Sequence, residues 1–299
     1  MSPTEALARL PAIDEVLQAA YGVAGFGPSL ARRITVQPDG FVAAEEAGDD
    51  GTARVVGVGT AVAYPDAGYG WLGLIGTHPD RERRGIGAAV TARLVELLER
   101  KGCAAVLDAS VAGRPVYERL GFVEAGVTTV LVAGTPPARR AAPDQTPDQT
   151  PDPTPDPTAD GVAPPLVAAD LAEVIAFDRR CTGADRSRLY GALCVEHEAR
   201  SFVARRGREL VGVAFATERS IAPLLAVDEA ALRSLLGAAL RLRYASAPTV
   251  VLPASSGHRA ALEAFGFTEQ RTLTHMRRGI GRLPGERGLI AGQASLGEG

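Results

Sequence analysis

The stretch WLGLIGTHPDRERRGIGAAVTARLVELLERKG, residues Trp71–Gly102, decides the fold. Its apolar start predicts a strand, and a loop containing Gly85 and Gly87 leads directly into an amphipathic helix that begins at Ile86. Glycines let a ligand approach the backbone, and the first turn of a helix has amide groups without partners. The segment therefore predicts a cradle for the phosphates of a ligand.

Arginines add positive charge to this loop. Arg81, Arg83 and Arg84 surround a single acid, Glu82. Backbone amides bind phosphate regardless of the side chains, whereas contact between a phosphate and the Glu82 carboxylate is repulsive. We therefore expect Arg81 or Arg83 to offset the charge of Glu82.

A proline-rich stretch divides the chain. In residues 135–165 the pattern Asp-x-Thr-Pro repeats from Asp144 onward. Proline fixes φ and aspartates repel one another, so this composition is typical of a disordered or extended, partly polyproline-II linker. The predicted domains are therefore 1–134 and 166–299.

The first domain has the pattern of a mixed α/β fold. Apolar residues at helical spacing predict helices, and β-branched or alternating runs predict strands. The predicted helices cover 13–20, 29–35, 86–100 and 114–120, and the predicted strands cover 40–46, 53–64, 70–77, 104–109 and 127–133. The first two strands are expected to form an antiparallel pair.

The glycine loop resembles the cofactor loop of the GNAT superfamily of N-acetyltransferases, which follows the pattern Q/R-x-x-G-x-G/A. Gly85 and Gly87 match the glycine positions, whereas Glu82 stands in the Gln/Arg position. The resemblance extends to VYERLGF, in which Tyr117 matches the family's Y-x-x-x-G-F ending. Because both motifs occur in the family's order, the first domain is identified as a member.

This resemblance implies a fold, a donor and a site. The implied fold class is α/β of the α+β kind: two GNAT-type domains, each a central mixed, mostly antiparallel sheet flanked by helices, with splayed strands at the acyl-CoA site of the first. Acetyl-CoA is the implied co-substrate, which gives its acetyl group to an amine by direct attack. The implied cofactor-binding residues are Leu74, Ile75, Gly76, Thr77, Arg81, Arg83, Arg84, Gly85, Ile86, Gly87 and Ala88.

Tyr117 and Asp108 are the predicted catalytic residues. A phenol stays protonated at neutral pH and can donate to a departing thiolate, so Tyr117 is the expected general acid, with packing over the cofactor as its alternative role. The base is chosen from Asp108, Glu45, Glu46 and His78, which the residues alone do not rank. Helix capping remains the alternative role for Asp108, and shaping of the loop remains the alternative for His78.

The second domain repeats the plan in divergent form. Leu262 stands where the first domain has its tyrosine. The stretch corresponding to the cofactor loop has no glycine before Gly237 and carries Asp228 and Glu229 where phosphates need amides and cations. We expect this GNAT-like domain to bind no coenzyme A and to build structure or part of the acceptor pocket.

Two other functions compete with this interpretation. A strand, glycine loop and helix followed by Asp108 also describe a dinucleotide fold, and hence a nicotinamide-dependent oxidoreductase. Against that, HPDRERR separates Thr77 from Gly85, and Val90 stands at the third glycine position. The other competitor is a non-catalytic acyl-CoA-binding or protein-interaction module. A P-loop is excluded because the loop lacks Gly-Lys-Ser/Thr.

Composition and charge limit the classes of partner that the chain is expected to bind. A formal net charge of −3 over 299 residues leaves no basic excess for nucleic acid. The apolar runs are too short to cross a membrane and no export signal is visible, so we expect a cytoplasmic protein. The expected acceptor is a small-molecule amine, with a protein amine as the alternative. Trp71 either lines the acceptor pocket or belongs to the core.

The cysteines and histidines predict no metal site. Cys103, Cys181 and Cys194 have neither disulfide nor zinc-ligand spacing, and the histidines of the second half show no ligand pattern. We expect buried, reduced thiols.

Overall fold

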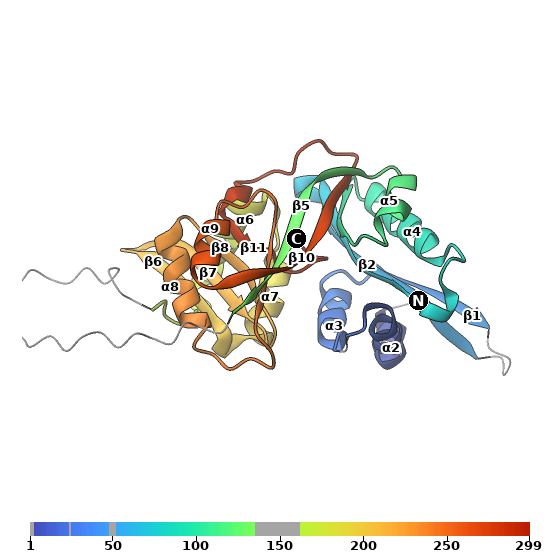
Figure 1. The fold of residues 1–299 in the computed structure, drawn as a ribbon, viewed down its shortest axis with the longest axis horizontal. Coiled ribbons are helices and arrows are strands. Elements are labelled where there is room, and N and C mark those ends of the chain that lie inside the picture. Colours follow the sequence, from blue (N-terminus) through green and yellow to red (C-terminus); the bar gives the residue numbers. More distant parts are fainter. Residues whose placement is uncertain (1–2, 24, 48–51, 135–161) are drawn as a thin grey trace, which may run out of the picture.

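The computed structural model describes residues 3–23, 25–47, 52–134 and 162–299. Figure 1 shows the arrangement of its elements. The first half forms α1 (Pro3–Ala8), α2 (Leu10–Tyr21), α3 (Gly27–Val36), β1 (Phe41–Ala47), β2 (Ala53–Tyr64), β3 (Tyr69–Thr77), α4 (Ile86–Arg100), β4 (Ala104–Ala109), α5 (Arg114–Arg119) and β5 (Val123–Ala133). The second half forms α6 (Leu171–Thr182), α7 (Ser187–Glu196), β6 (Ser201–Arg206), β7 (Glu209–Ala216), β8 (Ile221–Ala226), α8 (Glu229–Ala239), β9 (Thr249–Leu252), α9 (Arg259–Ala264), β10 (Phe267–Arg278) and β11 (Ile290–Gly292).

Every helix and strand predicted for the first half is present. The predicted strand 127–133 is longer than expected, because β5 already begins at Val123. The predicted linker, 135–165, lies outside the described residues except at its end.

The two halves share one sheet. The larger sheet has seven strands in the order β1-β2-β3-β4-β10-β5-β9, and a smaller one has four in the order β11-β8-β7-β6. Strand β10 of the second half lies between β4 and β5 of the first, and β5 in turn pairs with β9. Figure 1 shows β10 beside β5. Each half therefore supplies a strand that the other needs.

Strands β3 and β4 separate partway along their length. Their parallel pairing covers only Tyr69–Trp71 opposite Ala104–Val106. Beyond this point β4 continues to pair with β10, and β3 continues to pair with β2. The splayed strands that were predicted at the acyl-CoA site are thus present in the sheet.

Helices of the first half cover both faces of the larger sheet. Leu94 and Leu98 of α4 are fully buried against β2, β3 and β4, and burial of each leucine contributes about 1.5–3 kcal/mol. A Cβ on Gly59 of β2 would lie 2.7 Å from Val90, so glycine lets α4 approach the sheet closely. Helices α2 and α3 pack on the opposite face, through side chains such as Ile13 and Leu30.

The corresponding gap in the second half is filled by the chain itself. Strand β11 pairs with β8, where Ile290 lies opposite Leu225. Its other side reaches β9, because the Gln293 amide donates to the Val251 carbonyl at 2.8 Å. The strand therefore lies between β8 and β9.

Candidate active site

The glycine loop forms the start of α4. Gly85 is the N-cap residue and has a φ of +82°, which favours glycine over residues with a Cβ. The helix begins at Ile86, so the amides of Ile86, Gly87 and Ala88 lie in the first turn, where intrahelical acceptors are lacking. Within the described residues, no atom lies within 4 Å of the position that a Cβ on Gly85 would take, so the backbone is open to a ligand at this point.

The three loop arginines differ in their surroundings. Arg81 and Arg84 form ion pairs with Glu46 of β1, at N–O distances of 2.6 and 3.4 Å. Arg83 is exposed, and among the described residues its guanidinium has no ion-pair partner. Arg83 is therefore the loop arginine that is available to an anion without breaking a contact.

Strand β3 contains a bulge where it separates from β4. Leu74 has a φ of +51°, unusual for a residue with a branched side chain. The pairing with β2 shifts register at this point, so that Leu74 and Ile75 together lie opposite Gly59. Both residues are half-buried, whereas the strand before them is buried. The bulge therefore lies beside the opening between β3 and β4, and its two residues are less buried than the strand before them.

The end of β3 lies next to the loop. A Cβ on Gly87 would lie 3.4 Å from the Thr77 hydroxyl, so the first turn of α4 and the last residue of the strand are neighbours. The structure thus brings together the segments Leu74–Thr77 and Arg81–Ala88 along one edge of the opening.

Two tyrosine hydroxyls lie near this opening. Burial raises the pKa of Tyr117 to about 12, and among the described residues its hydroxyl has no hydrogen-bond partner. The Tyr21 hydroxyl donates to the Ile75 carbonyl at 2.8 Å. Loss of water around its hydroxyl, and next the neighbouring Tyr117, raise the pKa of Tyr21. Sequence patterns did not single out Tyr21, because nothing local distinguishes it from other tyrosines at helix ends.

Asp108 lies two residues beyond the last β3–β4 pair, at the start of the opening. Its side chain has no exposed surface. The carboxylate accepts hydrogen bonds from the Thr128 hydroxyl at 2.6 Å and from Nε2 of Gln293 at 2.9 Å. Nδ1 of His275 lies 3.0 Å from Oδ1. Asp108 does not cap the following helix, whose N-cap is Gly113 without a side-chain bond.

His275 lies beside Asp108, and sequence reasoning did not single it out as a candidate for the site. It lies on β10, directly opposite Asp108 of β4 in the antiparallel register. Its side chain is 13% exposed, and its ring centroid lies 5.6 Å from that of Trp71. Trp71 itself is fully buried, as expected for a core residue. Only the insertion of β10 brings His275 to this position.

The other base candidates are engaged elsewhere. Glu45 pairs with Arg9 of the N-terminal segment, and Glu46 pairs with the loop arginines. Arg81 lowers the pKa of Glu46, which makes this carboxylate a weaker base. Nδ1 of His78 accepts from the Asp80 amide at 3.3 Å, so His78 shapes the loop.

A segment after β11, residues 293–299, covers the face of the sheet opposite α4. Arg33 of α3 donates to the Ser295 hydroxyl at 2.8 Å, and its own exposure is only 4%. Glu298 pairs with Arg32 at 3.2 Å. Burial by itself raises the pKa of Glu298, but the guanidinium groups of Arg33 and Arg32 outweigh it and lower the pKa to about 2. We call residues 293–299 the tail segment.

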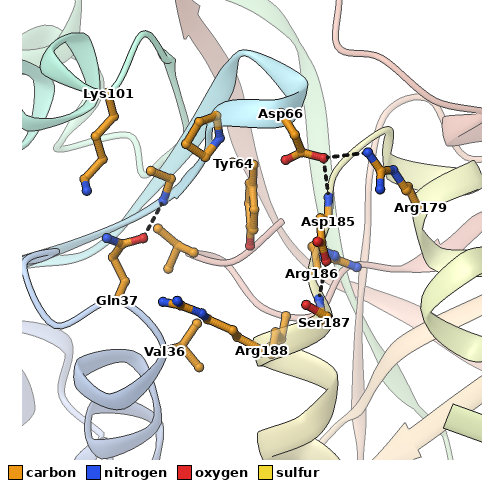
Figure 2. A pocket seen from close by; sticks show the side chains of 14 residues that line it. Val36, Gln37, Tyr64, Asp66, Lys101, Arg179, Asp185, Arg186, Ser187 and Arg188 are labelled. Atoms are coloured by element: carbon orange, nitrogen blue, oxygen red, sulfur yellow. Dashed lines mark hydrogen bonds and ion pairs between the residues drawn. The ribbon is translucent and has the colours of Figure 1, made fainter. Parts of the chain in front are cut away.

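A pocket of about 390 Å³ lies where the two halves meet (Figure 2). Asp66 of the first half accepts from the Asp185 amide at 2.9 Å and pairs with Arg179 at 3.3 Å. The Tyr64 hydroxyl and the Arg186 guanidinium line the pocket and both donate to the Glu298 carbonyl, so the tail segment lies directly behind them.

The cysteines are free: Cys103 and Cys181 are buried as expected, but Cys194 is only half-buried. Within the described residues, no cluster of histidine, cysteine and acidic side chains could hold a metal ion. The described helices are all too short or too polar to cross a membrane.

Two family models match the chain. The one described as acetyltransferase (GNAT) family matches residues 10–122, and the one described as acetyltransferase (GNAT) domain matches residues 174–292. No curated protein matches the chain.

Solved structures share the fold. A Pyrococcus horikoshii structure described as a candidate acetyltransferase is 22% identical, with a TM-score of 0.78 over 100% of this chain and 94% of that one. A GCN5-related N-acetyltransferase from Sphaerobacter thermophilus is 14% identical, with a TM-score of 0.58 over 93% and 94%. Another, from Anabaena variabilis, is 14% identical, with a TM-score of 0.55 over 91% and 70%.

Proposed function

The chain belongs to the GNAT family of acetyltransferases, and on this premise we propose that it is an acetyl-CoA-dependent N-acetyltransferase acting on a primary amine of a small molecule. The observation that carries the proposal is the position of the glycine loop. It lies beside the end of β3, at one edge of the opening between β3 and β4. A ligand with a diphosphate at the loop can extend from there along the bulged strand.

The loop residues hold the diphosphate in this proposal. Backbone amides of the first turn of α4 donate to its oxygens, and the positive end of the helix dipole favours its charge. Arg83 supplies a cation that no other residue in the described part of the chain engages. Its charge offsets that of Glu82, which is also exposed on the loop.

The bulged strand orients the donor. Bound acetyl-CoA supplies an activated acetyl group as a thioester. Backbone groups of Ile75 and Thr77 face the opening, where β3 has no neighbouring strand among the described residues, and they can bind the pantetheine amides. Tyr117 then donates a proton to the departing sulfur, because its raised pKa keeps the phenol protonated.

The second half is proposed to hold no donor. Asp228 is the N-cap of α8 and its carboxylate accepts from the Ala231 amide at 3.0 Å. A carboxylate therefore occupies the helix start where a phosphate would bind. Strand β11 fills the gap between β8 and β9. Both features leave a single donor site, in the first half.

A second candidate function is a non-catalytic acyl-CoA binder. The tail segment favours it, because a Cβ on Gly299 would lie 2.6 Å from Trp71 and the segment thereby restricts the room for an acceptor. A protein amine is the alternative acceptor within the transferase proposal.

One experiment separates these functions. The full chain is incubated with acetyl-CoA and a panel of small amines and lysine peptides, and free thiol is followed over time. We expect amine-dependent thiol release, with the product confirmed by mass spectrometry. Binding of acetyl-CoA in a calorimeter without thiol release would support the binder, and absence of binding would refute both.

A further inference from the structure

We propose that His275, held by Asp108, is the general base that takes the proton from the acceptor amine. This rests on the proposed transferase function. His275 is supplied by the second half, so the catalytic machinery of the first half is completed by the strand that the halves exchange.

Position supports this role. Asp108 lies on β4 just past Val106, where β4 loses its pairing with β3, and His275 is its register partner on β10. Although the Asp108 side chain is completely buried, the residue as a whole keeps some exposure, so its backbone faces the opening. The pair thus lies at the point where the two strands part.

Hydrogen bonding prepares the imidazole for proton removal. Asp108 is an acceptor through both oxygens, so Nδ1 of His275 donates to it and carries the hydrogen of the neutral ring. Nε2 is then the nitrogen with the lone pair, and within the described residues the ring's hydrogen bond is the one made by Nδ1. A carboxylate on Nδ1 also stabilises the cation that forms when Nε2 takes a proton. Asp108 is therefore a positioning residue.

Two neutral buried groups nearby lack hydrogen-bond partners within the described residues and point to a ligand. Gln293 uses its Nε2 on Asp108, which leaves Oε1 without a donor, although the residue is only 1% exposed. Nε1 of the fully buried Trp71, whose ring lies against His275, has no acceptor. A buried unpaired polar group is costly. An amine with a neighbouring hydroxyl or carbonyl can satisfy both groups.

The proton balance is as follows. An ammonium gives one proton to Nε2 of His275, and the resulting amine forms the C–N bond as the C–S bond breaks. The sulfur takes a proton from Tyr117, and the second proton leaving the nitrogen restores the phenol. His275 releases its proton to solvent, so each turnover releases one proton.

The test compares wild type with His275→Gln over pH 6–10. The charged groups near the imidazole include Asp108 on β4, Arg277 two residues further along β10, and Arg287, whose guanidinium lies 6.0 Å from the Trp71 ring centre. The register partner of His275 on β5 is Gly126. We expect kcat/KM to fall about 100-fold or more at pH 7. The loss should shrink towards pH 10, because an amine with a pKa near 10 then needs no base. A purely structural role would lower kcat/KM equally at every pH.

A second measurement does not depend on turnover. The chain has four histidines, so the imidazole resonance that His275→Gln removes can be assigned and titrated by NMR. In Asp108→Asn, the midpoint of this resonance's titration and the acid limb of the kcat/KM profile should both move to lower pH. The reason is that the protonated imidazole loses the carboxylate that stabilises it. His258→Gln is the control and should leave both the His275 titration and the kcat/KM profile unchanged, since this buried ring contacts the Ala226 carbonyl in the second half.

The outcomes are distinguishable. Wild-type thiol release with an unchanged pH profile in His275→Gln overturns the base and leaves the transferase function intact. A folded His275→Gln, shown by normal acetyl-CoA binding, with a pH-dependent loss supports the base. Wild type without thiol release overturns the transferase function and this proposal together. If His275→Gln does not fold, the His275 resonance is assigned by elimination from the spectra of His78→Gln, His197→Gln and His258→Gln, and the comparison of wild type with Asp108→Asn then decides.

Discussion

His275 and Asp108 are 167 positions apart in the chain, yet Nδ1 of the histidine lies 3.0 Å from Oδ1 of the aspartate. The contact exists because β10 pairs with β4 inside a sheet to which both halves contribute. A central polar pair of the candidate site is therefore also a contact between the two halves. Pairing of the two halves through β10 therefore completes this part of the candidate site.

This arrangement predicts that the first half does not fold alone. A fragment of residues 1–134 lacks β10, so the backbone groups of β4 and β5 that pair with it have no partner. We expect the fragment to be unfolded or aggregated by circular dichroism and to bind no acetyl-CoA. Mixing it with a fragment covering 162–299 should restore both signals. A folded, ligand-binding fragment 1–134 would contradict the shared sheet.

Replacing the proposed acid tests its role. Tyr117→Phe keeps the ring that packs 6.0 Å from Phe122 and removes the hydroxyl. We expect kcat to fall about 100-fold or more, while the dissociation constant for acetyl-CoA changes less than about threefold. Tyr244→Phe is a matched control, because burial raises the pKa of this tyrosine to about 12 as well, in the second half. Equal kcat values for wild type and Tyr117→Phe would remove Tyr117 from the mechanism.

A glycine elsewhere in the chain serves as a control for backbone strain when the glycine of the proposed phosphate cradle is replaced. Gly85 and Gly266 have φ values of +82° and +85°, and a Cβ on either would have no atom of the described residues within 4 Å. Alanine at each position should therefore cost a similar amount, about 1 kcal/mol of stability. Only Gly85→Ala places a methyl group beside the proposed phosphates, so we expect about tenfold weaker acetyl-CoA binding for it alone by calorimetry. Equal affinities in both variants would argue against the cradle.

Donor stoichiometry tests the second half. Asp228 at the start of α8 and strand β11 occupy the positions that a second donor would need. We expect one acetyl-CoA per chain in a calorimetric titration. In Asp228→Ala the stoichiometry should stay at one, because β11 still fills the gap. Two donors per wild-type chain would show that the second half retains a site.

The ion pairs of the tail segment predict acid sensitivity. The pKa of Glu298 is about 2 in the folded chain, against an ordinary value of 4.5. A lowered carboxyl pKa stabilises the fold at pH above about 5, and this contribution disappears as the pH falls towards 2. Glu298→Gln should therefore reduce the free energy of unfolding at pH 7, by about 3 kcal/mol as for other broken buried pairs, and by much less near pH 3.

Urea unfolding at several pH values checks this expectation. Glu286→Gln is the control, because Glu286 pairs with Arg180 at the surface, where 57% of its side chain is exposed. Its substitution should barely change stability at any pH. If Glu298→Gln also loses nothing at pH 7, the tail segment is not held by these ion pairs.

The sequence by itself determined the local elements and the family. The start of α4 at Ile86, the turn at Gly85 and the strand that precedes the loop all follow from neighbouring residues, because capping, glycine freedom and apolar periodicity act within a few positions. The two divergent copies of one plan were visible for the same reason.

Only the tertiary structure decided which residues meet in the opening. Glu45, Glu46, His78 and Asp108 looked equivalent as bases, and the structure distinguishes them by partners that lie far away in the chain. The insertion of β10 between β4 and β5 has no local signal, because strand pairing depends on the register and packing of whole elements. For that reason the sequence alone did not predict that His275 lies beside Asp108.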